Sequence, residues 1–396
     1  MSDRAGTPAP LPFYFQAMLH CYGAAIAAAA PDAFNAETNS LAYVTQQRLT
    51  QLDIAAAAAR RMRQTLDGIE AWRAHPHRRS GSTHQIIWQS GSASLLDYGA
   101  QNTNAPTVLI IPSLINRAYI LDLDTDTSFV MMLRQAVMRR VLLDWGDVGQ
   151  DEAGFDLDMF LQARAAPAAR FLINQTGRPI SLLGYCMGGT LAIGLAHDLG
   201  FNVNRLGLIG APWSFATLTG NAAMLRQALM QGGPERFRSE IQKMGAFLGA
   251  VPADLFQLLF ALLAPMQAAR KFSGFAPNGP KAKKFVAVEQ WLSDAVDMPA
   301  PAAGQLLIDW YHLDQTGAGN WSPFHRPVQL EEIMCPSLLI TGSRDHIATA
   351  AMTTPLSTGL AHCQTARFDT GHVGLVVGRN AHAETAYRLS TFFLED

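Results

Sequence analysis

Charge, cysteine and unbroken apolar runs are all scarce in this chain of 396 residues. Only 16% of the residues are charged and the formal net charge is −2, without a long lysine or arginine run, so nucleic acid is not an expected partner. The 4 cysteines lack Cys-x-x-Cys spacing, which argues against a disulfide framework or a zinc site. These absences predict a protein of the reducing cytoplasm that holds no metal.

Neither the N-terminus nor the apolar segments indicate export or membrane insertion. Residues 1–6 carry both charges and no apolar core, so no signal peptide is predicted. Residues 244–266 are almost entirely apolar, but Gly249, Pro252 and Asp254 interrupt them. This pattern predicts a pair of buried or surface-covering helices and no transmembrane span.

What the chain does contain is an alternation of short apolar runs with helical segments, typical of a mainly parallel sheet covered by helices. An early hairpin is predicted around Gly91. The predicted strands are 85–88, 94–98, 108–111, 141–143, 180–183, 206–209, 337–340 and 365–368. The fold class is therefore α/β.

The sequence predicts four segments along the chain. They are an N-terminal helical extension (1–84), the first part of the α/β core (85–211), a helical cap insertion (212–330) and the second part of the core (331–396). The cap is expected over the carboxyl edge of the sheet, where such folds bind ligands.

Within the extension, helices are predicted over residues 12–30 and from Asn39 or Ser40 to Ala74, the second ended by Pro76. We interpret the extension as helices packed on the core, with a docking surface as the alternative.

One stretch, Gly184-Tyr-Cys-Met-Gly-Gly189, joins a predicted strand to a helix-forming segment. Its Gly-x-Cys-x-Gly pattern is the thiol version of the Gly-x-Ser-x-Gly nucleophile elbow, in which glycines let strand and helix approach closely. The following helix would direct its positive end at Cys186 and favour the thiolate form. A lone match is weak evidence, since a free cysteine is often just a small core residue.

Two later residues complete a possible triad. A thiol nucleophile needs a base, and the base needs an orienting carboxylate. Asp345 and His372 each follow a predicted strand, in the nucleophile–acid–histidine order of α/β-hydrolases. We therefore predict a Cys186–His372–Asp345 triad. His346 is the rival base and Asp369 the rival acid, but each adjoins its partner too closely in sequence for a natural hydrogen bond.

The segment 112–117 follows an early core strand, where α/β-hydrolases supply one oxyanion-hole amide. The other amide is expected from Met187, directly after the nucleophile. Arg117 in this segment has two interpretations: a contact to a ligand phosphate, or a structural salt bridge.

Taken together, these motifs resemble the polyhydroxyalkanoate synthases, the polyester polymerases of storage granules. The resemblance runs from about residue 107 to the C-terminus and implies an α/β-hydrolase fold. It is carried by the blocks Pro112–Asp122, Leu143–Gly146, Gly184–Gly189, Phe285–Trp291, Ser343–Ile347 and Gly371–Gly374. The chain departs from the family pattern at Ser214, where an acidic residue is usual, and at Thr370, where a second glycine is frequent.

By this resemblance, Cys186 carries the acyl chain, His372 is the general base, Asp345 supports the base, and the amides of Met187 and Ile115 bind the oxyanion. The implied enzyme is an acyltransferase that polymerises (R)-3-hydroxyacyl-coenzyme A into polyhydroxyalkanoate and releases coenzyme A, without a cofactor. The implied partners are the growing polyester, the granule surface in the cytoplasm, and a second copy or a separate synthase subunit.

Two alternatives stay open. An intracellular polyester depolymerase or an acyl-coenzyme A thioesterase would use the same triad, with water taking the acyl group. A capped, dry site favours a hydroxyl acceptor. A protein without catalytic activity could instead bind granules through the apolar segment 244–266.

Overall fold

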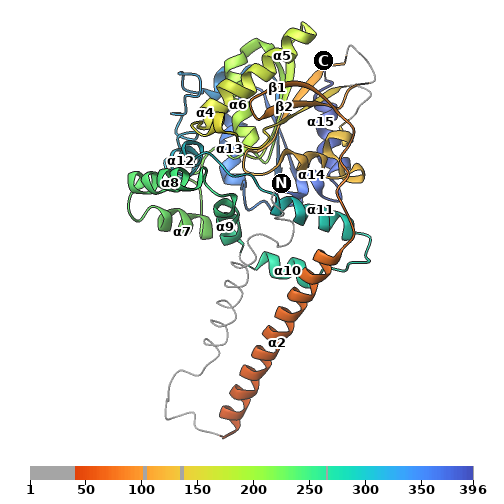
Figure 1. Cartoon of the computed structure of the whole chain (residues 1–396), viewed down its shortest axis with the longest axis vertical. Helices are drawn as coiled ribbons and strands as arrows, with labels where there is room; N and C mark the ends of the chain where they lie inside the picture. Colours follow the sequence, from red (N-terminus) through yellow and green to blue (C-terminus); the bar gives the residue numbers. More distant parts are fainter. Residues whose placement is uncertain (1–40, 101–104, 134–137, 265, 396) are drawn as a thin grey trace. The chain divides into compact units, whose positions relative to one another are not determined.

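A computed structural model describes residues 41–100, 105–133, 138–264 and 266–395 (Figure 1). The predicted helix over residues 12–30 and the predicted cap at Asn39 or Ser40 lie outside these ranges. The chain forms two compact units. One contains the chain up to Arg78 and Gln257–Ser293; the other contains Arg79–Phe256 and the chain from Asp294 onward. Part of the predicted cap therefore shares a unit with the N-terminal extension, and the four-segment division stays a prediction.

The second unit is built on an eight-stranded sheet with the order β1-β2-β4-β3-β5-β6-β7-β8. The strands are β1 (Gln85–Ser90), β2 (Ala93–Asp97), β3 (Thr107–Ile111), β4 (Arg139–Asp144), β5 (Ile180–Tyr185), β6 (Val203–Ile209), β7 (Ser337–Gly342) and β8 (Cys363–Phe368). The pairs β1–β2 and β2–β4 are antiparallel, and all later pairs are parallel. This order confirms the predicted α/β-hydrolase fold, and each predicted strand is present.

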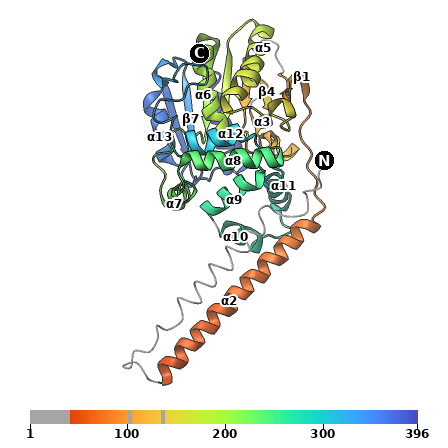
Figure 2. The same ribbon diagram turned by 60° about the vertical axis from the view of Figure 1, so that its left-hand side comes forward.

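The central strands lie in the middle of the core because their sequences are apolar on both sides. Every residue of β3 and β5 is buried, as expected for strands covered on both faces of a parallel sheet. The helix α6 (Met187–Leu199) contacts β3, β5 and β6, and Figures 1 and 2 show it beside the strands. The carboxyl end of β5 leads straight into this helix.

Local sequence signals explain several element boundaries. Gly91 forms the β1–β2 turn with φ +54°, a left-handed conformation that suits glycine. The helical stretch over 156–176 begins where the Asp156 carboxylate accepts a hydrogen bond from the Met159 N–H at 2.7 Å. It ends at Gly177, which has φ +64°. The hairpin predicted around Gly91 is confirmed.

The remaining α-helices of this unit have between 4 and 15 residues. They are α3 (Phe129–Met132), α4 (Leu157–Phe160), α5 (Ala166–Thr176), α7 (Gly220–Leu229), α8 (Pro234–Leu248), α12 (Ala300–Gly304), α13 (Ala350–Gly359), α14 (Gly374–Val377) and α15 (Tyr387–Phe392). The apolar segment 244–266 is divided between the end of α8 and α9 (Ala253–Leu263), as its interruptions predict. Across the described ranges, no helix is both long and apolar enough to cross a membrane.

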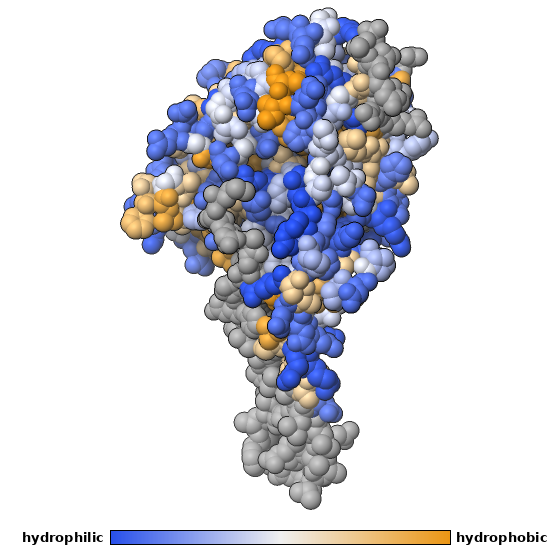
Figure 3. Space-filling model, turned by 45° about the vertical axis from the view of Figure 1, so that its right-hand side comes forward, coloured by the Kyte–Doolittle hydropathy of each residue, from blue (hydrophilic) through white to orange (hydrophobic). Residues whose placement is uncertain are grey.

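The first unit joins the long helix α2 (Leu41–Ala74) to α10 (Gln267–Ser273) and α11 (Ala282–Ser293). Trp72 packs edge-on against Phe272 with ring centroids 6.1 Å apart. A Cβ atom at Gly68 would lie 1.9 Å from the Phe272 carbonyl oxygen, so this glycine allows α2 and α10 to touch. Figure 3 shows mainly hydrophilic residues on the visible, coloured part of α2.

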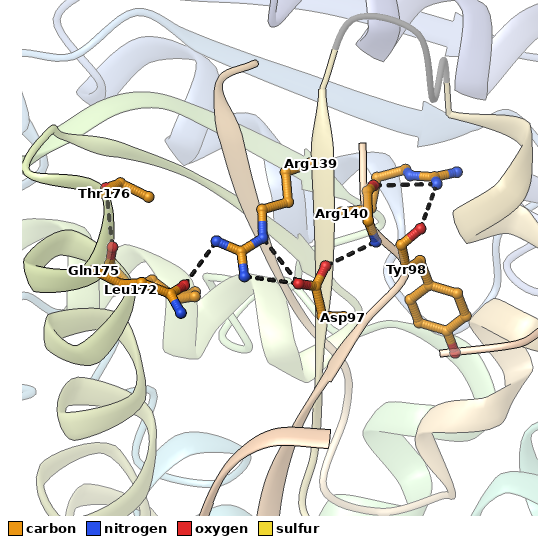
Figure 4. Close-up of polar contacts among 8 residues, drawn as sticks. Asp97, Tyr98, Arg139, Arg140, Leu172, Gln175 and Thr176 are labelled. Atoms are coloured by element: carbon orange, nitrogen blue, oxygen red, sulfur yellow. Dashed lines mark hydrogen bonds and ion pairs between the residues drawn. The ribbon is translucent and has the colours of Figure 1, made fainter. Parts of the chain in front are cut away.

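Ion pairs hold the antiparallel side of the sheet to its neighbours. Arg139 donates to the Asp97 carboxylate at 2.7 and 2.9 Å and to the Gln175 side chain at 2.7 Å, which links β4, β2 and α5 (Figure 4). The fully buried Arg140 donates to the Tyr98 carbonyl at 2.9 Å. Neighbouring arginines thus satisfy carbonyl and carboxylate groups that the strands alone leave unpaired.

A second ion pair is almost completely buried. Glu152 is 1% exposed and contacts Arg164 at 2.5 Å. Its carboxylate also accepts hydrogen bonds from the N–H groups of Ser92 at 2.9 Å and Gly149 at 3.0 Å. This carboxylate therefore ties the β1–β2 turn to the segment before α4.

We expect Glu152→Ala to lower the free energy of unfolding by about 3 kcal/mol, because it leaves the buried Arg164 charge without its partner. Urea denaturation measures this change. The control is Glu240→Ala, which removes an exposed pair with Lys243 (3.0 Å) and should cost less than about 0.5 kcal/mol. Equal effects of the two substitutions would contradict the prediction.

Candidate active site

Cys186 lies at the turn between β5 and α6 in a strained backbone conformation. Its φ of +56° and ψ of −131° fall outside the regions that side-chain-bearing residues favour. The turn is held by hydrogen bonds from the Cys186 N–H to the Ile209 carbonyl (2.9 Å) and from the Gly189 N–H to the Cys186 carbonyl (2.8 Å). The side chain is partly exposed and forms no disulfide. This is the geometry of a nucleophile elbow.

The glycines of the motif are required by close backbone approaches. A Cβ atom at Gly184 would lie 2.4 Å from the Gly189 Cα atom. A Cβ atom at Gly188 would lie 2.2 Å from the Ile111 carbonyl oxygen, and one at Gly189 would lie 2.4 Å from the Ala211 Cβ atom. Larger residues would push α6 away from β3, β5 and the end of β6, and the sulfur would leave the sheet edge.

The structure brings Asp345 and His372 into direct contact. The Asp345 Oδ2 atom lies 2.7 Å from the His372 Nδ1 atom. The other carboxylate oxygen accepts hydrogen bonds from the N–H groups of Ile347 (2.8 Å) and Ala348 (2.9 Å). Because both oxygens are occupied and both side chains are buried, the carboxylate holds the imidazole in one orientation.

The end of β6 leaves room for this pair. A Cβ atom at Gly210 would lie 3.1 Å from two ring atoms of His372 and 3.4 Å from the Asp345 Oδ2 atom. Gly210 also has φ +52°, which a glycine adopts without strain. Glycine at position 210 is therefore favoured both by the backbone conformation and by the small space beside the His372–Asp345 pair.

Cys186 affects the pKa of His372 through its charge. Burial by itself would lower the pKa of His372, but the negative charge of the Cys186 sulfur and then the Asp345 carboxylate overcome it and raise that pKa to about 10. The Nε2 atom is buried and has no partner with standard hydrogen-bond geometry among the described residues, although the sulfur is close enough for this electrostatic effect. Such hydrogen bonds often tighten only when substrate binds. The charges of Cys186 and Asp345 thus favour the imidazolium form of His372.

The two rival residues lie elsewhere. The exposed Asp369 accepts a hydrogen bond from Ser343 at 2.8 Å and pairs with Arg344 at 3.1 Å. His346 is exposed to solvent. Neither side chain is recorded in contact with His372.

The two predicted oxyanion amides differ in their present partners. Met187 is the first residue of α6, so its N–H has no acceptor within the helix. The Ile115 N–H donates to the Ser113 side-chain oxygen at 3.2 Å. In this structure the second amide is therefore engaged with a neighbouring hydroxyl, and the oxyanion role of both amides stays a prediction.

Arg117 takes part in ion pairs, in line with the structural interpretation. Its guanidinium lies 2.6 Å from Asp147 and 3.3 Å from Asp294. The Tyr119 hydroxyl donates to Asp294 at 3.1 Å, and Asn116 forms a bridge with Ala295. The segment that carries Ile115 is thus joined to residues 294–295.

Sequence reasoning missed three residues around this site. Tyr185 stacks on His372, Ser113 occupies the Ile115 amide, and Asp314 accepts hydrogen bonds from the Ser214 hydroxyl (3.0 Å) and the Phe215 N–H (2.6 Å). The Ser214 hydroxyl thus contacts a carboxylate from a residue distant in sequence. Of the three, Tyr185 could have been found from the sequence, because it directly precedes the nucleophile. The contacts of Ser113 and Asp314 arise only from the folded structure.

The fold and site define a class: an α/β-hydrolase-fold protein with cysteine, aspartate and histidine at the three strand ends where this fold carries nucleophile, acid and base. No protein-family model matches the chain.

Comparison with proteins of known name identifies relatives of this chain within the class. The poly(3-hydroxyalkanoate) polymerase subunit PhaC of Haloarcula marismortui is 28% identical over 326 residues, which cover 78% of this chain and 67% of that protein. The same subunit of Haloferax mediterranei is 29% identical over 322 residues, covering 79% of this chain and 64% of that protein. In Synechocystis it is 27% identical over 278 residues, 68% of this chain and 72% of the relative. The chain is related to these polymerase subunits, as its motifs predict, and spans about two thirds of the length of the two haloarchaeal ones.

Solved structures align with much of the chain at lower sequence identity. A thioesterase domain from the curacin biosynthetic pathway is 14% identical with a TM-score of 0.46, covering 80% of this chain and 100% of that one. An esterase from Exiguobacterium antarcticum is 16% identical with a TM-score of 0.45 and the same coverage.

We expect Cys186→Ala to lower the pKa of His372 from its value of about 10, because the cationic ring loses one of two neighbouring anions. Titration of the histidine ring protons by NMR measures the shift. Cys335→Ala is the matched control, since burial raises the pKa of that thiol to about 11 and keeps it neutral. An unchanged His372 titration in Cys186→Ala would show that sulfur and ring do not interact.

Proposed function

We propose that this protein is an acyltransferase that polymerises (R)-3-hydroxyacyl-coenzyme A into polyhydroxyalkanoate through an acyl-cysteine at Cys186. The observation that carries the proposal is the 2.7 Å contact between His372 and Asp345, with a charge-coupled thiol at the elbow beside it. The relationship to polymerase subunits supports the choice of substrate. No metal or redox cofactor is needed for this chemistry.

Acylation begins with the Cys186 thiolate, which attacks the thioester carbonyl carbon. The Met187 amide stabilises the oxyanion that forms, and the Ile115 amide joins it when the Ser113 hydroxyl turns away. Collapse of the intermediate breaks the bond to the coenzyme A sulfur. The imidazolium of His372 gives its Nε2 proton to that sulfur, so coenzyme A leaves as a thiol and His372 becomes neutral.

Transfer uses the neutral imidazole. His372 takes the proton of a chain or monomer hydroxyl, whose oxygen attacks the acyl-Cys186 carbonyl. An ester forms, the sulfur leaves as a thiolate, and the imidazolium is restored. Asp345 stays ionised throughout and holds the ring orientation. Cysteine suits the first step because exchange of one thioester for another is nearly isoenergetic.

Partner and location belong to the same proposal. The relatives are named as polymerase subunits, which favours a second chain, either another copy or a different synthase subunit. The polymer product favours a place in the cytoplasm at the granule surface. A hydrolase with the same residues is the competing function, since water can replace the hydroxyl in the second step.

We expect purified protein incubated with (R)-3-hydroxybutyryl-coenzyme A to release free thiol and to form insoluble polyester. Cys186→Ala and His372→Gln should lose at least about 1,000-fold in thiol release, as removal of a nucleophile or its base does in triad enzymes. His346→Gln is the matched control and should keep wild-type activity. Free acid without polymer would favour the hydrolase, and full activity in Cys186→Ala would remove the nucleophile assignment.

Ser113→Ala tests the second oxyanion amide. The substitution frees the Ile115 N–H from its 3.2 Å hydrogen bond, so we expect thiol release equal to or faster than in the wild type, by up to about fivefold. Initial rates at saturating substrate measure this. A loss of 100-fold or more would show that the Ser113 hydroxyl itself acts in the reaction.

A further inference from the structure

Tyr185 is the last residue of β5 and lies directly against the base. It is 3% exposed, and its ring stacks on the His372 imidazole with centroids 5.3 Å apart and planes inclined by 26°. Its hydroxyl is buried without a hydrogen-bond partner among the described residues. A buried hydroxyl without a partner costs stability, so any benefit of this side chain at the site has to come from its ring.

The ring can act on the charge of His372. Burial, and next the charges of Cys186 and Asp345, raise the pKa of Tyr185 well above its usual value, so the phenol stays neutral. The face of a neutral aromatic ring attracts a cation, and this attraction is strongest where water is excluded. An imidazolium stacked on such a face is stabilised relative to the neutral imidazole.

We propose that Tyr185 is a positioning residue whose ring face fixes the plane of His372 and stabilises its imidazolium form, while its hydroxyl contributes nothing. The effect on turnover rests on the function proposed above; the effect on the ring charge does not. The stacked face leaves the edge of the imidazole free, so that Nδ1 meets Asp345 and Nε2 is left for the sulfur.

Besides Tyr185, three residues at strand ends lie near the His372 ring. Asp345 follows β7 and Cys186 follows β5, and each contributes a negative charge. Gly210, after β6, contributes only backbone at this point. Among the described residues, Tyr185 is therefore the aromatic side chain that contacts the ring, and its removal can be tested while both charges are retained.

Three variants separate the ring from the hydroxyl. Tyr185→Phe keeps the aromatic face, whereas Tyr185→Leu and Tyr185→Met replace it with apolar side chains. NMR titration should give an unchanged pKa of His372 in Tyr185→Phe and a pKa lower by about 0.5 to 1.5 in Leu and Met. The melting temperature of Tyr185→Phe should equal or exceed that of the wild type, because the unpaired hydroxyl is gone.

Thiol release provides the second readout. Transfer of a proton to coenzyme A needs the imidazolium, so the rate falls as pH rises through the His372 pKa. This alkaline limb should move to lower pH in Tyr185→Leu and Tyr185→Met and stay in place in Tyr185→Phe. A structural role alone would lower the rate without moving the limb.

Two results would overturn the proposal. One is an unchanged His372 pKa in both Leu and Met variants that retain the wild-type circular dichroism spectrum. The other is a pKa or rate in Tyr185→Phe as low as in Tyr185→Leu, which would assign the effect to the hydroxyl. If the wild type releases no thiol, the proposed function fails, but the NMR comparison still decides the role of the ring.

Discussion

The close approach of β5 and α6 is the constraint on which the site depends. Only glycine fits at positions 184, 188 and 189, because backbone or Cβ atoms of neighbouring elements lie within 2.4 Å of where a Cβ would be. With those glycines in place, the chain can turn so sharply that Cys186 takes a left-handed φ and its sulfur stands at the sheet edge. The packed core supplies the energy that holds this strained residue, since every residue of β5 and nearly all of α6 is buried.

The strand ends at this edge of the sheet also hold a buried cationic histidine, His372, beside two residues that can carry negative charge. A buried cationic ring would ordinarily lose its proton, because removal from water penalises charge. Here the carboxylate of Asp345 has a hydrogen bond for each oxygen, and Cys186 together with Asp345 raises the pKa of His372. The three groups offset one another's desolvation, so the charge of His372 depends on two anions supplied by different strand ends.

Much of this was predictable because the signals are local. Gly91 marks the predicted hairpin turn, and Pro76 follows closely on the end of α2. The order of Cys186, Asp345 and His372 at three strand ends follows from parallel strands ending at one edge. The assignment of residues 257–293 to the unit of α2 was not predictable, since it depends on tertiary contacts such as Trp72 on Phe272.

Side-chain partners distant in sequence could not be predicted for the same reason. Asp314 lies about one hundred positions after Ser214, and no local pattern predicts that its carboxylate will accept a hydrogen bond from the Ser214 hydroxyl. Ser113 is close to Ile115, but whether a serine hydroxyl accepts from the amide two residues later depends on its rotamer, which packing decides.

The rotamer of Ser113 bears directly on how the site changes during a reaction. The segment from Pro112 to Tyr119 is held by the β3 ladder on one side and by Arg117 and Tyr119 on Asp294 on the other. Displacing this backbone would break several contacts, whereas rotating one serine side chain breaks a single hydrogen bond of 3.2 Å. The developing oxyanion is a stronger acceptor than a neutral hydroxyl. In the mechanism we propose, substrate therefore recruits the Ile115 amide by exchange of acceptors, with the loop itself left in place.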